Sequence, residues 1–401
     1  MNEWKDYKLG ELYDVSSGLS KSADQFGSGF VFISFKDVFN NYFIPEFPDG
    51  LVNSNEKDRK TCSVQKGDIL ITRTSEVIEE VGMSSVALKD YQNSTFNGFC
   101  KRLRPKKESP IKISPLFVGY LLRTRFFRKT VANYATMTTR ASLNGESIKS
   151  IPLKFPPFNL QNVIGKTLHS LDQKITVLRE QNQTLEELAQ TLFKQWFVDF
   201  EFPDKNGEPY KSSGGKMVES EMGEIPEGWR VGEYQDIVYI SSGKSLKKNE
   251  FIDGGKYSVI GANGVLGHTD KFLIDYKAIV TGRVGTLGTV YITNKPVWLS
   301  DNVLVSKPVK DIFFYFSYFT LKGFNFKSLN SGSTQPLITQ KDLRSVELVI
   351  PKDKILQDYQ NTVKKLFQKI ACNDEEIQYL TKLRDTLLPK LMSGKLKIEN
   401  N

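Results

Sequence analysis

The chain is poor in the side chains from which catalytic and metal sites are most often built. It has 2 histidines and 3 cysteines among 401 residues. His169 and His268 are far apart in the sequence, with no cysteine or carboxylate at metal-ligand spacing. Cys62, Cys100 and Cys372 lack the short spacings of a zinc site or a disulfide framework, so we expect reduced thiols. These absences argue against a self-sufficient enzyme.

Long apolar runs are also missing. The N-terminus, MNEWKDYKLGEL, is polar and has no apolar stretch like that of a signal peptide. No stretch reaches the apolar length that is needed to span a bilayer. Together with reduced cysteines, this predicts a cytoplasmic protein. The 55 lysines and arginines exceed the 46 acidic residues, which favours a polyanionic partner but does not identify one.

The chain contains the same features twice. Trp4 precedes the tripeptide Ser-Ser-Gly at 16–18, and Trp229 precedes the same tripeptide at 241–243, a shift of 225 residues (229 − 4). A ten-residue pattern of Gln, Leu and Thr recurs 195 residues on (378 − 183), at 183–192 and 378–387. A repeat of this length indicates a duplicated domain and not a solenoid, whose period is far shorter.

The duplication predicts two β-rich domains. In residues 1–150, short apolar or alternating runs such as FVFISFKDV and GDILITRT are typical of strands, and a helix is expected over 115–129. Residues 225–346 repeat this pattern, with a helix over 312–321. Residues 201–224 are rich in Gly, Ser, Pro and charge, which predicts a surface linker.

A long helix is expected after each domain, within residues 151–200 and 347–401. Apolar residues follow alternating spacings of four and three over 164–196 and again over 359–391. Heptads sustained this long predict a coiled coil. The alternative is two amphipathic helices packed on separate cores, but such helices usually carry a wider apolar stripe.

Polar positions in the heptads indicate the direction of the pair. In a parallel pair, Asn182 and Asn373 would each face an apolar residue as an unpaired amide. An antiparallel register that places Ile164 opposite Leu391 avoids this cost. It brings Asn182 to Asn373, so the two amides satisfy each other and fix the register. Only Arg384 fits this seam poorly, and we expect its charged head to lie in water.

No motif for a cofactor or catalytic centre accompanies these elements. Phe155–Phe158 is similar to the Pro-Pro-aromatic element of adenine methyltransferases, but it lacks the leading Asn, Asp or Ser and suits a rigid turn before a helix. Gly282–Gly288 has neither dinucleotide nor phosphate-loop spacing. We expect His169 at a solvated or partner-facing position and His268 in a loop. No cofactor is therefore expected on this chain.

Several segments carry a family resemblance that covers the whole chain. They are LFKQWFVDFEFP at 192–203, PYKSSGG at 209–215, IPEGW at 225–229 and GSTQPL at 332–337. With the duplicated order of domains and helices, they resemble the specificity subunits of type I restriction–modification systems. The first copy departs from the last pattern, with TTRASL at 138–143, and of the IPEGW entry it keeps only a tryptophan.

The resemblance implies an α+β fold in which two target-recognition domains are separated by a long antiparallel two-helix coiled coil, as a pseudo-two-fold tandem repeat. Each domain would read one half of a bipartite site in double-stranded DNA. The helices would set the spacing and dock two modification (methyltransferase) subunits, and restriction subunits would complete the complex. ATP and S-adenosylmethionine, if the assembly uses them, would bind other subunits.

Two other classes of function stay open at this point. One is a protein-interaction scaffold with a coiled-coil spacer and no DNA-reading role. The other is a self-sufficient methyltransferase or nuclease, against which the missing cofactor and metal motifs argue. The resemblance favours a non-catalytic chain whose enzymatic activities reside in partner subunits.

We expect DNA contacts from polar side chains at turns that follow strands. Arg73 and Arg283 hold similar positions in the two copies and are the preferred candidates for base contacts. The other candidates in the first domain are Ser17, Lys21, Thr74, Thr139 and Arg140. Those in the second domain are Lys244, Lys247, Ser333, Thr334 and Gln335. A basic cluster is expected to touch phosphates or solvent: Arg102, Arg104, Lys106 and Lys107.

Overall fold

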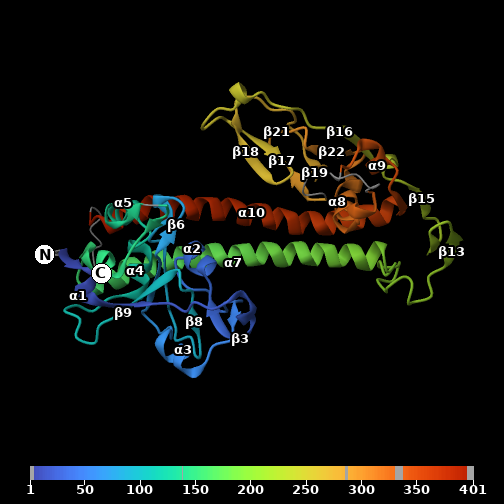
Figure 1. The fold of residues 1–401 in the computed structure, drawn as a ribbon. Helices are drawn as coiled ribbons and strands as arrows, with labels where there is room; N and C mark the ends of the chain where they lie inside the picture. The colour runs from blue at the N-terminus through green and yellow to red at the C-terminus, as the bar shows by residue number, and fades with distance from the viewer. Residues whose placement is uncertain (1–3, 138, 285–287, 330–336, 395–401) are drawn as a thin grey trace. The chain divides into compact units, whose positions relative to one another are not determined.

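The chain folds into two compact units whose boundary crosses both long helices. The structure is a computed structural model and describes residues 4–137, 139–284, 288–329 and 337–394. One unit comprises Met1–Leu178 with Glu375–Asn401, and the other comprises Arg179–Asp374. Each unit therefore holds one β-rich domain and about half of each long helix (Figure 1).

The first unit is built on a four-stranded antiparallel sheet in the order β2-β9-β5-β7. These strands are β2 (Tyr13–Ser17), β9 (Cys100–Pro105), β5 (Ile69–Thr72) and β7 (Ser84–Val86). A second sheet has the order β4-β3-β8, with β3 (Phe26–Ile33) antiparallel to β4 (Leu51–Val52) and parallel to β8 (Thr95–Phe96). Two short sheets complete the unit: β1 (Lys5–Lys8) with β12 (Pro152–Phe155), and β6 (Thr74–Ser75) with β11 (Ala141–Ser142) and β10 (Thr136–Met137).

The central strand β5 is buried on both faces, which explains its continuous apolar run. Ile69 and Ile71 point into a core shared with the helices, while Leu70 points into a core shared with the three-stranded sheet. This alternation follows from the two-residue period of a strand. The same arrangement recurs at the matching strand of the second unit, where Ile279 and Val280 lie in different cores.

The helix expected over 115–129 is in fact two helices, so this prediction was wrong. The short helices of the first unit are α1 (Leu9–Leu12), α2 (Phe35–Asn40), α3 (Glu56–Thr61), α4 (Pro115–Leu121), α5 (Arg125–Tyr134) and α6 (Gly145–Ser150). Between α4 and α5, Thr124 caps the second helix by accepting a hydrogen bond from the Phe127 N–H. The guanidinium of Arg123 donates to the carbonyls of Val38 and Asn41, at 2.7 Å each. These bonds hold the break, and burial lowers the pKa of Arg123 to about 10.

The second unit repeats the sheets of the first. Its four-stranded sheet has the order β16-β22-β19-β20, formed by β16 (Val238–Ser242), β22 (Val303–Pro308), β19 (Ala278–Gly282) and β20 (Val290–Thr293). Its three-stranded sheet, β18-β17-β21, also combines an antiparallel and a parallel pair, from β18 (Gly264–Thr269), β17 (Tyr257–Gly261) and β21 (Trp298–Leu299). The strand pair β15 (Arg230–Glu233) and β23 (Glu347–Ile350) matches β1 and β12. The duplication predicted from the sequence is therefore confirmed.

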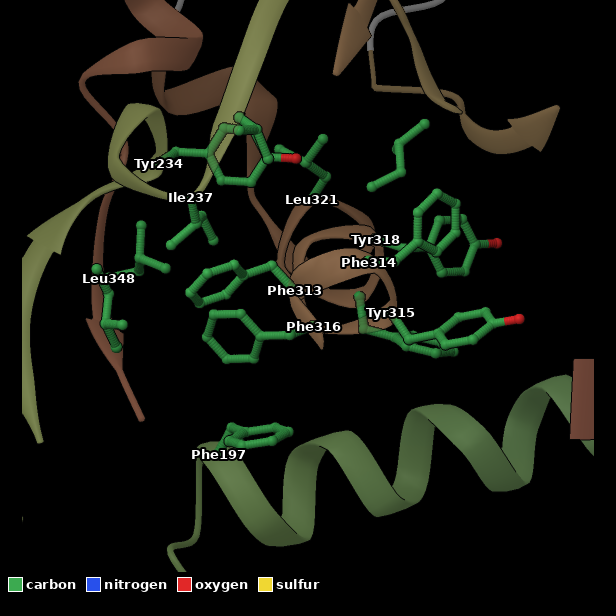
Figure 2. Packing of buried hydrophobic residues seen from close by; sticks show 14 of the residues in the cluster. Phe197, Tyr234, Ile237, Phe313, Phe314, Tyr315, Phe316, Tyr318, Leu321 and Leu348 are labelled. Atoms are coloured by element: carbon green, nitrogen blue, oxygen red, sulfur yellow. The ribbon is translucent and has the colours of Figure 1, made fainter. Parts of the chain in front are cut away.

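Aromatic side chains fill the core of the second unit around α8 (Phe314–Gly323), as Figure 2 shows. Phe197 meets Phe316 edge to face, with ring centroids 4.9 Å apart. After the long helix, the chain turns back and Phe202 stacks on Trp229 at 5.0 Å. Two of the four segments that carry the family resemblance, 192–203 and 225–229, therefore pack against each other. The remaining elements here are α9 (Gln340–Arg344) and a hairpin of β13 (Met217–Ser220) and β14 (Gly223–Pro226).

The long helices α7 (Phe158–Phe197) and α10 (Asp353–Met392) have 40 residues each, or roughly 60 Å at ~1.5 Å per residue. In the second unit, the Asn373 side-chain N–H donates to the Asn182 side-chain oxygen at 2.8 Å, the contact that the antiparallel register predicts. In the first unit, Arg384 lies 2.6 Å from Asp172. The helix segments are antiparallel in both units, which confirms the predicted fold class.

Arg384 does not extend its charge into water, and that prediction was wrong. Its side chain is 20% exposed and forms ion pairs with Asp172 at 2.6 Å and Asp385 at 2.8 Å. Burial alone would lower the pKa of Arg384, but these two carboxylates raise it above its ordinary value. The seam therefore carries a paired polar layer in each unit. No helix in the described part of the chain has the length and apolar character that a membrane crossing requires.

Candidate nucleic-acid interface

One end of the four-stranded sheet in the first unit presents Arg73. This arginine follows directly after β5, and its backbone N–H donates to the Phe99 carbonyl at 2.9 Å. Its own carbonyl accepts from the Leu143 N–H at 2.8 Å. The residue is half-buried, and its Nε is enclosed without a hydrogen-bond partner among the described residues. The backbone is therefore fixed on both sides. Because the enclosed Nε cannot reach a ligand, the donors available to one are the two terminal guanidinium nitrogens.

The second unit places Arg283 in the same way. Arg283 follows directly after β19, donates its N–H to the Asn302 carbonyl at 3.0 Å and accepts from the Ile338 N–H at 3.0 Å. It too is half-buried, and its Nε has no partner in the described chain. Two arginines that sequence reasoning paired by position alone thus share one structural position, defined by matching backbone bonds.

A lysine that was not predicted from the sequence, Lys101, lies on the strand next to that of Arg73. Lys101, near the start of β9, donates to the Ser17 hydroxyl at 2.7 Å, at the end of β2. Lys101 pairs with Ile71 of β5, two residues before Arg73, and burial together with the charge of Arg73 lowers the pKa of Lys101. The strand pairing that sets Ser17 against Lys101 could have suggested this neighbour once the strands were known.

Three other predicted residues gather on the small sheet next to Arg73. Thr74 lies in β6 and pairs with Ser142 of β11. Thr139 and Arg140 are exposed on the turn between β10 and β11. The Arg140 guanidinium lies 3.7 Å from Glu76, with both side chains largely exposed, so this ion pair is weak.

Lys21 differs from the other candidates because its charge is already engaged. Its amino group lies 2.8 Å from the Asp58 carboxylate, and both side chains are partly buried. The hydrogen bond from Lys21 lowers the pKa of Asp58. Any contact of Lys21 with a phosphate would therefore compete with this ion pair.

In the second unit, the predicted lysines are solvent-facing. Lys244 and Lys247 are exposed, and the Lys244 carbonyl accepts a bond from the Trp298 indole N–H at 2.8 Å. Nearby, the Gln340 amide donates to the Ser242 hydroxyl at 2.9 Å, at the end of β16. The remaining candidates lie outside the described residues: Ser333, Thr334 and Gln335.

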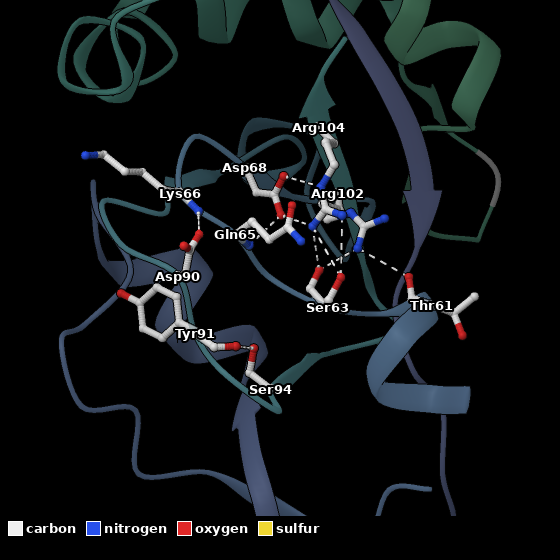
Figure 3. Close-up of polar contacts among 10 residues, drawn as sticks. All are labelled: Thr61, Ser63, Gln65, Lys66, Asp68, Asp90, Tyr91, Ser94, Arg102 and Arg104. Carbon is white, nitrogen blue, oxygen red and sulfur yellow. Dashed lines mark hydrogen bonds and ion pairs between the residues drawn. The ribbon is translucent and has the colours of Figure 1, made fainter. Parts of the chain in front are cut away.

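Arg102 and Arg104, the two arginines of the predicted basic cluster, have a structural role in β9, contrary to expectation (Figure 3). Lys107, which follows the strand, is exposed as expected. Arg102 is buried and donates to the Thr61 carbonyl at 3.2 Å. Arg104 lies 2.6 Å from the Asp68 carboxylate and donates to the Ser63 carbonyl at 3.1 Å. Strand alternation directs both arginines to one face, where residues 61–68 supply their partners. Lys106 is also engaged, with its amino group 2.6 Å from the Gly10 carbonyl.

The sequence predicted a solvated or partner-facing position for His169 and a loop position for His268, and the second prediction was wrong. His169 is half-buried, its ring meets Phe43 with centroids 5.3 Å apart, and burial lowers its pKa. His268 lies in strand β18 and not in a loop. Within the described ranges, no group of three or more His, Cys, Asp or Glu side chains is arranged to hold a metal ion.

The repeated sheet ends, the antiparallel helix segments and the duplicated order define a tandem-repeat protein of two β-rich domains with two long helices. The chain matches the family described as "Type I restriction modification DNA specificity domain" over residues 1–187 and 226–382, and it belongs to this family. Two relatives cover nearly its whole length. The type I restriction enzyme MjaIX specificity subunit of Methanocaldococcus jannaschii is 27% identical, with 99% of this chain and 94% of the relative covered.

The second relative is the type I restriction enzyme HindI specificity subunit of Haemophilus influenzae. It is also 27% identical, with 99% of this chain and all of the relative covered. Among solved structures, a type I restriction–modification system S subunit from M. genitalium shares the fold, with a TM-score of 0.61 at 16% identity over 97% of this chain and 96% of that one. The chain is therefore a DNA specificity subunit and not the catalytic component of its system.

Proposed function

We propose that each unit reads one half of a bipartite site in double-stranded DNA through the sheet end that carries its arginine. The observation that carries this proposal is the shared position of Arg73 and Arg283, each held by two matching backbone hydrogen bonds. Duplicated domains with the same contact position suit a site of two separate parts.

The chemistry of these sheet ends suits DNA. A guanidinium can bond guanine at two atoms in the major groove, which gives sequence information. Hydroxyls and lysines, such as Ser17, Lys101, Lys244 and Lys247, suit phosphate oxygens, which give affinity and position. The net charge of +9 agrees with this reading. Because phosphate contacts release counterions, affinity should fall steeply as salt rises.

The long helices then set the distance between the two readers and dock two modification subunits, with restriction subunits completing the complex. The paired polar layers, Asn182 with Asn373 and Arg384 with Asp172, support a fixed helix register. We assign residues 1–150 and 225–346 to the reading domains and 201–224 to the linker. Residues 151–200 then contain the first spacer helix, and residues 347–401 contain the second spacer helix and the C-terminal tail. Methyl transfer and DNA cleavage belong to the partner subunits.

Methylation mapping tests this function. The full chain is co-expressed with its modification subunits in cells that lack other methyltransferases, and modified bases are located by sequencing. We expect one bipartite motif, and Arg73→Ala should relax or abolish recognition of one half only. Arg283→Ala should do the same for the other half. The loss of a direct base contact corresponds to about 1–3 kcal/mol of discrimination.

Matched lysine substitutions serve as controls. Lys89→Ala and Lys295→Ala each remove a positive charge just beyond β7 or β20, at the sheet end opposite Arg73 or Arg283. They should leave the motif unchanged. A motif without two parts, or loss of both halves from one arginine substitution in a stable complex, would contradict the proposal. Absence of salt-sensitive DNA binding by the assembled complex would favour the scaffold alternative.

A further inference from the structure

Beside each arginine, the chain makes the same tight turn with different residues at its tip. The turn Asn97–Cys100 closes with a bond from the Cys100 N–H to the Asn97 carbonyl at 2.9 Å. The turn Ser300–Val303 closes in the same way, from the Val303 N–H to the Ser300 carbonyl at 3.3 Å. Both turns lead directly into the strand that neighbours the arginine's strand, β9 or β22.

The third residue of each turn is held by matching bonds. The Phe99 N–H donates to the Asn97 side-chain oxygen at 2.8 Å, and its carbonyl accepts from the N–H of Arg73 at 2.9 Å. The Asn302 N–H donates to the Ser300 hydroxyl at 3.4 Å, and its carbonyl accepts from the N–H of Arg283 at 3.0 Å. Phe99 and Asn302 are therefore structural equivalents, each one hydrogen bond away from the equivalent arginine.

The repeated Ser-Ser-Gly tripeptides support these turns from behind. A Cβ atom on Gly18 would lie 2.2 Å from the Asn97 carbonyl oxygen, and one on Gly243 would lie 2.0 Å from the Ser300 carbonyl oxygen. Only glycine permits this approach. Gly18 and Gly243 therefore pack directly against the two turns. This contact fixes the conformation in which each turn exposes its third residue to solvent.

At the tips, the two copies differ in chemistry. The Phe99 side chain is 53% exposed. Asn302 is also exposed, and its side-chain amide makes no hydrogen bond to the described residues. One position thus carries an apolar ring in the first unit and an amide in the second, with the same arginine next to it.

We propose that Phe99 and Asn302 are specificity-determining residues, which read the base pair next to the one contacted by Arg73 or Arg283. This inference rests on the proposed DNA-reading function. An apolar side chain favours the methyl group of thymine, whereas an asparagine amide bonds adenine at two atoms. Phe99 therefore selects thymine in its half-site, and Asn302 selects adenine in the other.

Exchanging the two side chains tests the proposal. The full chain with Phe99→Asn, or with Asn302→Phe, is co-expressed with the modification subunits, and the methylated motif is mapped. Phe99→Asn should change the preferred base from thymine to adenine at one position of one half. Asn302→Phe should make the reverse change in the other half. We expect a shift in relative preference of roughly tenfold or more, and Phe99→Leu should keep the thymine preference.

Two controls separate reading from general surface effects. Phe47, with 80% of its side chain exposed, and Asn294, which follows β20 at the sheet end opposite Arg283, are distant from the turns. Phe47→Asn and Asn294→Phe should therefore leave the motif unchanged. If a turn variant yields no methylation, the purified complex selects bound duplexes from a library randomised at the half-site, and an altered preference supports the proposal.

Failure of this inference and failure of the proposed function give different results. An active complex whose base preferences are the same with Phe99→Asn and with Asn302→Phe overturns this inference, whether read by methylation or by selection. A wild-type complex that yields no bipartite motif overturns the proposed function instead. A change at both halves from one substitution also contradicts the inference, because each turn belongs to one unit.

Discussion

Asn182→Leu should destabilise the second unit more than Asn373→Leu, although the two amides bond to each other. Asn373 is fully buried, and Asn182 is half-buried and also donates to Asp374 at 2.8 Å. Asn182→Leu removes the 2.8 Å acceptor of the buried Asn373 amide and leaves Gln181, at 3.5 Å, as its remaining hydrogen-bond partner in the described chain. Leaving a buried donor poorly satisfied costs about 1–3 kcal/mol.

Asn373→Leu should have little effect on the free energy of unfolding, or raise it. It removes a side-chain oxygen that is already buried without a partner, and it places an apolar side chain in an apolar seam. Asn182 keeps its bond to Asp374, and water can reach its half-exposed amide. We therefore expect Asn373→Leu, alone or combined with Asn182→Leu, to remain within about 1 kcal/mol of the wild type or to exceed its stability.

Amide hydrogen exchange measures this difference, because it gives the free energy of opening for individual segments. The opening free energy of helix residues 179–197 and 353–374 is compared among wild type, both single variants and the double variant. Asn361→Leu, at an exposed position of α10, is the control and should change it by no more than about 0.5 kcal/mol. Equal losses from the two single substitutions, or no loss from Asn182→Leu, would refute the reasoning.

Two further predictions concern acid sensitivity and the turns. The Tyr318 hydroxyl donates to the Glu186 carboxylate at 2.6 Å, and Lys322 forms an ion pair with the same carboxylate. Burial alone would raise the pKa of Glu186, but these two partners hold it below its ordinary value of 4.5. The stability that ionised Glu186 contributes is fully present above pH 4.5 and is lost as pH falls through the folded-state pKa. In Glu186→Gln, the urea concentration at the unfolding midpoint should therefore decrease less on acidification than in the wild type. Gly18→Ala and Gly243→Ala should each cost about 1–3 kcal/mol of unfolding free energy and weaken recognition of one half-site. Gly145→Ala and Gly323→Ala, where an added Cβ meets no atom closer than 4.0 Å, should be tolerated.

The features that the sequence predicted well are those with a fixed period. Helical heptads specify which residues share a seam, so the contact between Asn182 and Asn373 could be derived from their spacing alone. The repeat specified the equivalence of Arg73 and Arg283 in the same way. The misassigned features depend on partners far away in the chain. Arg104 finds its carboxylate at Asp68, and Arg123 breaks a helix by binding carbonyls more than 80 residues away.

The shift between the two copies shows where they have diverged. It is 225 residues at the glycines (243 − 18), 210 at the arginines (283 − 73), 203 at the turn tips (302 − 99) and 195 at the segments that bond the arginine carbonyls (338 − 143). Each decrease in the shift means that the first unit has extra residues between the two positions compared. Helices α2 and α3 lie in the first of these segments, between Gly18 and Arg73. The positions that build the sheet end nevertheless coincide in structure. The first unit is therefore the longer one in its peripheral segments, while the arginine and its neighbouring turn make matching backbone bonds in both units. Phe99 and Asn302 are then equivalent positions at which the two sheet ends differ in side-chain chemistry, as the inference about base reading requires.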